Sequence, residues 1–453
     1  MGTRIADAPE YAHLWASDDL RAVFEHSARL QAWLDILSTL AEVQAELDII
    51  PQAAAASIRR DARVERLDQK ILIDETRRTG HSTLGLVRAL QAALPDHARE
   101  WVYYGATVQD LTDSWVALTA QRVGAILRRD LGQLEHTCLE LAGRHRDTVM
   151  VGRTHGQPGS PITFGYKAGS WADELRRHLD RLDDGRLRWE VGQLGGAVGT
   201  LAFFGESGLE LRERFCTRLG LRTPAISWLT ARDRIAEFGH VLAMVAATLG
   251  RIGTEIYTLQ RPEIGELREA RSAGGVGSIT MPHKRNPEVS EHLVTLSRLA
   301  RAQAAVLLEA MVGEHERDGR SWKTEWIALP EVCLLTGASV ALGRDVLAGL
   351  EIDAAAMERN LRDTAGYTAS ERVLATLAPR LGKHRAQAAL QEVLDQGRSD
   401  GSSLRQALAA HPELSVLGDR MLELLEQPDV GLAAAMVDEV VRHAEASRRS
   451  GRQ

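Results

Sequence analysis

The sequence is poor in cysteine, and this scarcity excludes several kinds of site. Of its 453 residues only three are cysteine, namely Cys138, Cys216 and Cys333. They are too far apart for a metal-binding motif or a disulfide framework. Each lies in an apolar helical context, so we expect buried, reduced thiols and a cytoplasmic location.

The sequence also lacks a long apolar run and an excess of positive charge. No stretch of about 18 apolar residues occurs, and the N-terminus has no apolar signal core, so we predict no membrane span. The net charge of −7 and the pI near 6.1 argue against a nucleic-acid-binding protein. His315 lies between two glutamates but not in a helical zinc motif, so we expect no metal and no cofactor.

Lysine and asparagine are scarce too, yet one lysine and one asparagine stand together within a stretch of three residues. The sequence has five lysines among 55 basic residues and two asparagines, and Lys284 and Asn286 stand close together. They end a glycine-rich run over residues 274–287, Gly-Gly-Val-Gly-Ser-Ile-Thr-Met-Pro-His-Lys-Arg-Asn-Pro. Because glycine loses the most entropy when it is ordered, we predict a mobile loop here.

A helix is predicted directly after this loop, from Glu288 to about Met311, because apolar residues recur at three- and four-residue steps. Pro287 suits a first helical position and Asn286 suits an N-cap. The loop would then bring Ser278 and Lys284 to the positive end of a helix, which suits an anionic substrate. A surface turn with a solvated lysine is the plainer alternative.

Strands with two-residue alternation are nearly absent, and long apolar helical patterns fill much of the chain. Long helices are expected at about 110–144, 162–190, 232–259, 288–311 and 329–350, and a shorter one at about 63–78. Several are apolar on more than one face, as are helices buried among others. We therefore predict an all-α protein with an N-terminal helical domain (1–104), a central bundle of long helices (105–352) and a small C-terminal helical domain (353–453).

Four breaks in the helical pattern carry unusual polar content, and we expect each to join or open a helix. Besides the loop at 274–287 they are Gly80-His81-Ser82, residues 105–110 with Thr107 and Gln109, and residues 152–158 with Thr154, His155 and Gln157. Helix N-termini present N–H groups that bind carboxylates. His155 stands among hydrogen-bonding residues and is a candidate acid or base, although a structural histidine is the plainer alternative.

Three further charged positions have both a functional and a plain interpretation. Glu291 lies one turn after Pro287 and could orient and charge a histidine, or could be a solvated helix residue. The stretch Arg232-Asp233-Arg234 opens a long helix and could be an exposed, ion-paired helix start. Residues 313–326, which include Arg317 and two tryptophans, are predicted to form a charged link between helices that acts as an amphipathic lid or wall.

Together these stretches resemble the signature motifs of the fumarase/aspartase superfamily, which includes adenylosuccinate lyase, argininosuccinate lyase and 3-carboxy-cis,cis-muconate cycloisomerase. Residues 277–287 match Gly-Ser-Ser-x-Met-Pro-x-Lys-x-Asn-Pro except at Ile279. Residues 152–158 resemble Arg-Thr-His-x-Gln. Residues 105–113 resemble Gly-Ala-Thr-Ser-Gln-Asp-x-x-Asp, with Val108 in place of the serine. The likeness spans the whole chain.

The resemblance implies three helical domains, with a central bundle that gives five long helices to the twenty-helix core of a homotetramer. It also implies active sites built by three subunits and an anti-elimination across a small succinyl dicarboxylate. The implied roles are base for Ser278, carboxylate binding for Lys284, Asn286, Thr107 and Gln109, and leaving-group assistance for His155 paired with Glu291. Further substrate contacts are expected from His81, Thr154, Gln157 and Arg317.

The chemistry explains why these residue types are needed. Removing a weakly acidic proton beside a carboxylate creates a dianion, so N–H groups and a cation must stand where the charge grows. A serine can act as the base only in a closed, dry site with positive charge nearby. A mobile loop that ends at Lys284 would provide that closure.

Departures from the motifs concern the identity of the substrate. Val108 and Ile279 each remove a hydroxyl beside the expected anion. Trp322 and Trp326 stand where adenylosuccinate lyases have groups for the nucleotide phosphate, which argues against a nucleotide and favours the carboxymuconate cycloisomerase branch. We predict a lyase that cleaves a C–N bond of a 2-substituted succinate and releases fumarate. A cycloisomerase and a non-catalytic, crystallin-like relative are the alternatives.

Overall fold

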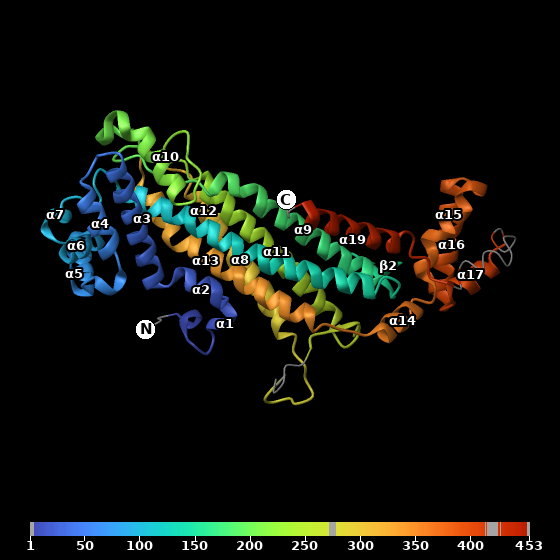
Figure 1. The fold of residues 1–453 in the computed structure, drawn as a ribbon. Helices are drawn as coiled ribbons and strands as arrows, with labels where there is room; N and C mark the ends of the chain where they lie inside the picture. The colour runs from blue at the N-terminus through green and yellow to red at the C-terminus, as the bar shows by residue number, and fades with distance from the viewer. Residues whose placement is uncertain (1–3, 271–277, 413, 415–424, 426, 451–453) are drawn as a thin grey trace. The chain divides into compact units, whose positions relative to one another are not determined.

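The structure is a computed structural model that describes residues 4–270, 278–412, 414, 425 and 427–450. Residues 274–277 of the predicted loop lie outside the described residues. Figure 1 shows that helices make up most of the described chain, with short strands between some of them. The all-α class predicted from the sequence is confirmed.

The long helices lie close to where the sequence predicts them, with one exception. They are α8 (Val108–Arg144), α9 (Phe164–Trp189), α11 (Asp233–Leu259), α12 (Glu288–Glu309) and α13 (Gly319–Ala348). The exception is α13, which begins well before the predicted start at residue 329. The predicted link over residues 313–326 is therefore wrong in its second half, because these residues form the first turns of a helix.

Local contacts explain this early start of α13. The Asp318 carboxylate accepts the backbone N–H of Arg320 at 2.9 Å, as a residue before a helix does. Trp322 and Trp326 then pack edge to face one turn apart, with ring centroids 4.9 Å from each other. Charged residues fill these first turns, so the apolar periodicity that marks the rest of the helix does not reach them.

The chain divides into two compact units, and each long helix contributes residues to both. The first unit comprises Met1–Asp130, His178–Leu249 and Thr295–Ala341. The second comprises Leu131–Arg177, Gly250–Val294 and Leu342–Gln453. This grouping cuts across the three-domain division, which stays a prediction.

Two of the long helices, α11 and α13, are long and apolar enough to span a membrane by length and composition alone. The absence of a membrane span therefore stays a prediction. Of their most apolar windows, 72% in α11 and 61% in α13 are buried inside the protein. Burial of this kind is what core helices of a globular protein show.

The N-terminal part of the first unit consists of shorter helices. They are η1 (Ile5–Asp7), α1 (Ala12–Trp15), α2 (Asp18–Phe24), α3 (His26–Glu46), α4 (Gln52–Asp61), η2 (Val64–Arg66), α5 (Gln69–Thr79), α6 (Leu84–Ala93) and α7 (Asp96–Arg99). Figure 1 shows α4 to α7 gathered beside α3. Farther along the chain, η3 (Ala202–Ser207) and α10 (Gly208–Arg218) follow, and α10 packs against α3.

The helix predicted over residues 63–78 is shorter than expected. Its first part is the 3-10 turn η2, and α5 begins only at Gln69. The reason is Asp68, whose carboxylate accepts the backbone N–H of Lys70 at 2.8 Å and so caps the helix.

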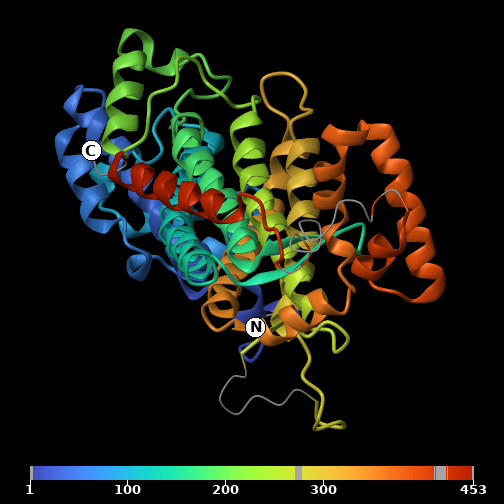
Figure 2. The same cartoon turned by 90° about the vertical axis from the view of Figure 1, so that its right-hand side faces the viewer.

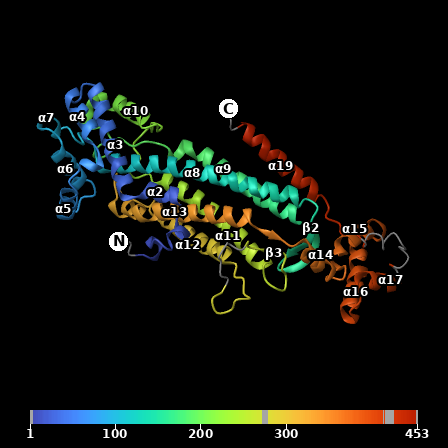
Figure 3. The same ribbon diagram turned by 60° about the horizontal axis from the view of Figure 1, so that its bottom comes forward.

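The second unit contains the strands and the C-terminal helices. Strands β1 (Val149–Thr154) and β2 (Gln157–Thr163) form an antiparallel hairpin, and β3 (Leu267–Arg268) pairs with β4 (Glu351–Ile352). The helices are α14 (Ala354–Arg362), η4 (Tyr367–Ala369), α15 (Ser370–Leu381), α16 (Lys383–Asp400), α17 (Leu404–Ala410) and α19 (Ala433–Ser450). Figure 3 shows α14 and α15 near β2.

Within this unit α19 lies apart from the group α15 to α17. Figures 1 and 2 both show α19, drawn in red, away from these orange helices. Two ion pairs hold it instead to the α8 end of the unit. Asp438 pairs with Arg146 at 2.7 Å, and Arg448 pairs with the fully buried Glu135 at 3.0 Å.

All three cysteines are buried and form no disulfide, as the sequence predicts. Burial raises the pKa of the Cys138 thiol, and that of Cys216, to about 12. Neither thiol is therefore ionised at neutral pH, and neither is a candidate nucleophile.

Candidate active site

In the first unit the structure joins two predicted substrate-binding residues that lie far apart in the sequence. Arg317 donates a hydrogen bond from Nη2 to Oγ1 of Thr107 at 2.7 Å, and a second from Nη2 to the Ala197 carbonyl at 2.9 Å. Both side chains are half-buried. A guanidinium and a hydroxyl held together in this way form a ready contact for a carboxylate.

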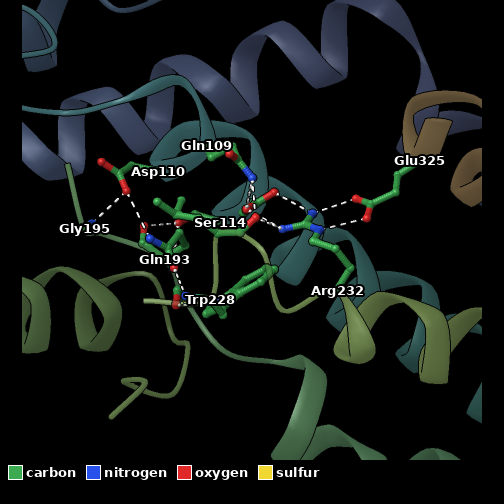
Figure 4. Close-up of polar contacts among 11 residues, drawn as sticks. Gln109, Asp110, Ser114, Gln193, Gly195, Trp228, Arg232 and Glu325 are labelled. Atoms are coloured by element: carbon green, nitrogen blue, oxygen red, sulfur yellow. Dashed lines mark hydrogen bonds and ion pairs between the residues drawn. The ribbon is translucent and has the colours of Figure 1, made fainter. Parts of the chain in front are cut away.

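Asp110 fixes Thr107 in this position. Its carboxylate accepts the backbone N–H groups of Thr107 at 2.9 Å, Gly195 at 2.8 Å and Gly196 at 3.0 Å. The Gln193 amide also donates to it, at 3.3 Å (Figure 4). Burial raises the pKa of Asp110 to about 6, while the N–H donors act to lower it. The carboxylate therefore links the start of α8 to the loop 193–196 that precedes Ala197.

That loop is itself pinned to α8. The Ser114 hydroxyl donates to the Gln193 carbonyl at 2.9 Å and accepts the Gln193 N–H at 3.1 Å. The Gln193 side-chain oxygen accepts the backbone N–H of Trp228 at 2.9 Å. Figure 4 shows these residues converging on one buried polar network. Each group is held by several others, so the network gives Thr107 a rigid support.

Gln109, predicted to bind a substrate carboxylate, lies inside this network rather than at a surface. It has no exposed area. Its amide nitrogen donates to the Leu229 carbonyl at 2.9 Å and to Asp113 at 3.2 Å. Val108, the departure from the motif, is buried as well. Direct binding by Gln109 stays a prediction, and the observed contacts give it a packing role.

Arg232 carries a buried charge. The interpretation of its stretch as an exposed helix start is therefore wrong for this residue. Its guanidinium pairs with Asp113 at 2.8 Å and with Glu325 at 2.6 Å, and all three side chains are at most 3% exposed. The Trp228 ring lies under the guanidinium, 5.2 Å from its centroid. Burial raises the pKa of Glu325, although Arg232 acts to lower it. This triad ties α8, α11 and α13 together behind Thr107.

His81 caps a helix in the same unit. Its Nδ1 accepts the backbone N–H groups of Thr83 at 3.3 Å and Leu84 at 3.2 Å, at the start of α6. These bonds require the neutral ring to carry its proton on Nε2. The exposed His81 side chain therefore presents an N–H donor.

In the second unit the break at residues 152–158 is a β-hairpin, so the expectation that it joins or opens a helix is wrong. His155 and Gly156 have positive φ angles of 54° and 73°, and Thr154 pairs with Gln157 on either side of them. Two central residues of this kind form a tight hairpin turn. The segment was too short, and too rich in glycine and proline, to show strand alternation. Thr154, His155 and Gln157 are all exposed at its tip.

A buried carboxylate holds the base of this hairpin. Glu266 is fully buried and accepts two hydrogen bonds from Arg153, at 2.7 and 2.8 Å. Asn360, from α14, donates to the same carboxylate at 2.8 Å and to the Ile264 carbonyl at 2.8 Å. A bidentate arginine pair with a third donor fixes geometry strongly. The position of His155 is thus set within the second unit.

The described end of the loop contains a turn built on Ser278. The Ser278 hydroxyl oxygen accepts the backbone N–H of Met281 at 3.0 Å. The Met281 carbonyl in turn accepts the backbone N–H of Lys284 at 2.9 Å. Ser278 is half-buried, Lys284 is exposed, and Ile279 is 95% exposed. Ile279 therefore makes little contact within the chain.

The predicted N-cap of α12 is wrong. The backbone N–H groups of Val289 and Ser290 donate to the carboxylate of Glu269, at 3.2 and 2.6 Å. Asn286 instead donates from Nδ2 to Glu288 at 3.2 Å. The positive end of this helix is thus occupied by the protein's own carboxylate. An anion at the loop would be bound by side chains rather than by the helix terminus.

Arg285 fastens this part of the loop to its surroundings. Its guanidinium donates to the Glu269 carbonyl at 2.8 Å and pairs with Glu351 at 3.2 Å. Its own carbonyl accepts a hydrogen bond from Gln260 at 3.1 Å. Ser278 and Lys284 are therefore close in the chain to a residue, Arg285, that is held by several contacts.

Glu291 lies exposed in the first turn of α12. Within the described part of the chain, no hydrogen bond joins it to His155. The predicted pairing stays a prediction. Within the described ranges, no three or more His, Cys, Asp or Glu side chains gather as they would to hold a metal ion.

Comparisons with known proteins show the family to which the chain belongs. A family model described as Lyase matches residues 14–301. N-acetyl-S-(2-succino)cysteine lyase from Dickeya dadantii is 37% identical over 448 residues, which cover 98% of each chain. The chain belongs to the fumarase/aspartase superfamily of lyases. Adenylosuccinate lyase from Methanothermobacter thermautotrophicus is 38% identical over 95% of this chain and 97% of its own.

Solved structures of the fumarase/aspartase superfamily also match. The crystal structure of 3-carboxy-cis,cis-muconate lactonizing enzyme from Pseudomonas putida superimposes with a TM-score of 0.87 at 34% identity. It covers 96% of this chain, and this chain covers 98% of it. The protein is therefore an enzyme of this superfamily, and the non-catalytic alternative is set aside.

Sequence reasoning missed the residues that position the superfamily motifs. Asp110 and Asp113 stand inside the quoted motif at 105–113, so their presence there was a usable signal. Glu266 and Glu269 belong to no quoted motif. Only the fold shows that they hold the hairpin and the start of α12.

Proposed function

We propose that the protein is a lyase that removes a substituent from C2 of a 2-substituted succinate by anti-β-elimination and releases fumarate. Ser278 is the base that takes the proton from C3. The observation that carries this proposal is the hydrogen bond from the Met281 N–H to the Ser278 oxygen at 3.0 Å. An N–H donor aimed at the serine oxygen stabilises the alkoxide that a serine base requires.

The charge that grows on the substrate needs donors at each carboxylate. Lys284 and Asn286 follow Ser278 closely in the chain and bind the carboxylate beside C3. Thr107 and Arg317, which are hydrogen-bonded to each other at 2.7 Å, suit the other carboxylate. His81 contributes its Nε2–H to the binding of this second carboxylate. The buried amide of Gln109 contributes through packing.

The leaving group departs from C2 with the electron pair of its bond and acquires a proton. His155 supplies that proton, and its exposure at the tip of its hairpin supports this role. Glu291 orients and charges it. We propose that these two meet in a cytoplasmic homotetramer whose sites are shared between subunits. No cofactor takes part in this chemistry.

The atom that leaves is a nitrogen or a sulfur. The sequence favours a C–N bond, and one relative is named adenylosuccinate lyase. The name of the Dickeya dadantii relative indicates a thioether of succinate instead. A cycloisomerase remains the second candidate because the Pseudomonas putida structure superimposes so closely.

Substrate assays with Ser278→Ala test the proposal. Purified protein is incubated with N-acetyl-S-(2-succino)cysteine, adenylosuccinate and 3-carboxymuconolactone, and fumarate is followed by its absorbance. We expect fumarate from a succinate derivative and at least about a 10²-fold loss of turnover in Ser278→Ala. Ser170→Ala, an exposed serine on α9, is the matched control. No fumarate from any succinate, or an unchanged rate in Ser278→Ala, contradicts the proposal.

A further inference from the structure

The first unit contains a cavity of about 1020 Å³ that none of the predicted roles uses. Helices α2, α3, α5, α8 and α13 surround it. Aromatic side chains form much of its wall, namely Phe24, Trp33, Trp115, Trp322 and Trp326. Trp115 packs edge to face against Phe24 at 6.4 Å and Trp33 at 6.2 Å between ring centroids. Such a wall favours an apolar, flat molecule.

Arg29 lines this cavity, and no ion pair within the described residues balances its positive charge. It is half-buried, and no carboxylate in the described part of the chain forms an ion pair with it. Its guanidinium carbon lies 5.7 Å from the centroid of the Trp33 ring, and its Nη2 lies 3.3 Å from Nδ1 of His26. Its Nε has no hydrogen-bond partner among the described residues. A partly desolvated cation of this kind is stabilised by an anion.

Other charged residues also line the wall, among them Arg21 and Arg77. Arg4 already pairs with Asp7 and Glu331. Glu325 pairs with Arg232 in the buried triad. Glu25, one turn before Arg29, also lines the cavity but makes no ion pair with it within the described chain. The charge on Arg29 therefore remains available to a ligand.

The cavity adjoins the segments that carry predicted substrate residues. Ser82, which follows His81, lines it. So does Thr112, which lies on α8 shortly after Thr107 and is only 5% exposed. The Thr112 hydroxyl has no hydrogen-bond partner among the described residues. Trp322 lines the cavity on α13, shortly after Arg317.

We infer that this cavity receives the leaving group of the substrate, and that this group has an apolar or aromatic body and an anionic group that pairs with Arg29. The inference rests on the proposed function. In that reaction the C2 substituent leaves with its bonding electrons and takes up a proton, while C3 loses one. A small leaving group, such as ammonia, would leave the aromatic wall and the Arg29 charge unused.

A binding experiment on the full-length protein tests the site without requiring turnover. The probes are 2-naphthoate and its neutral isostere 2-naphthamide, measured by quenching of tryptophan fluorescence. We expect the wild type to bind the anion about tenfold more tightly, as a partly buried charged contact would give. Arg29→Gln removes the preference and leaves naphthamide binding unchanged. Arg29→Lys keeps part of it, and the surface variant Arg78→Gln keeps all of it.

A competition assay then identifies the ligand as the leaving group. In fumarate release from a succinate derivative, 2-naphthoate should raise KM without changing kcat. Equal binding of both probes to wild type and Arg29→Gln overturns the inference. So does binding that depends on Arg29 but does not compete with the substrate. Probe binding without fumarate from any succinate contradicts the proposed function instead, so the two failures are distinguishable.

Discussion

Replacing Arg232 by methionine tests how much the buried triad stabilises the first unit. Methionine keeps the apolar length of the side chain but removes all its donors. The substitution breaks contacts of 2.8 Å to Asp113 and 2.6 Å to Glu325, and leaves two carboxylates buried without a cation. Removing one partner of a buried ion pair costs about 3–5 kcal/mol. We therefore expect the free energy of unfolding to fall by about that amount.

The assay is a urea titration followed by tryptophan fluorescence, to which Trp228 against Arg232 contributes. Arg78→Met is the matched control, because Arg78 pairs with Glu75 at the surface, where solvent screens the pair and its contribution is small. A triple variant that also carries Asp113→Asn and Glu325→Gln should recover most of the loss, since no charge is then left buried. A loss in Arg232→Met no larger than in Arg78→Met would refute the reasoning.

Two further predictions follow from the site. Because burial raises the pKa of Asp110 to about 6, its stabilising contribution is complete below its ordinary pKa and is lost as pH rises through 6. The advantage of wild type over Asp110→Asn in unfolding free energy should fall by up to about 3 kcal/mol between pH 4 and 7, and a pH-independent difference would contradict this. Mixing inactive Ser278→Ala subunits with inactive His155→Asn subunits should restore fumarate release if the sites are shared between subunits. Asparagine is chosen at position 155 because it tolerates a positive φ. Mixtures as inactive as either variant would exclude sharing.

The helices and the motif residues could be predicted from the sequence because both depend on local spacing. Apolar residues at three- and four-residue steps located α8, α9, α11 and α12 nearly to their ends. Where local spacing was weak the prediction failed. The hairpin around His155 showed no alternation, and the charged first turns of α13 hid the helix that carries Trp322.

The sequence by itself determined the class of fold, the superfamily motifs and the identity of Ser278 as the expected base. Only the tertiary structure decided which side chains meet. It joined Thr107 to Arg317 and buried Gln109 and Arg232. It also made Glu269 the acceptor for the backbone N–H groups at the start of α12. It also placed Arg29 on the wall of a cavity that aromatic side chains line. These contacts join residues far apart in the chain, and no local periodicity encodes them, because they depend on how whole helices pack against one another.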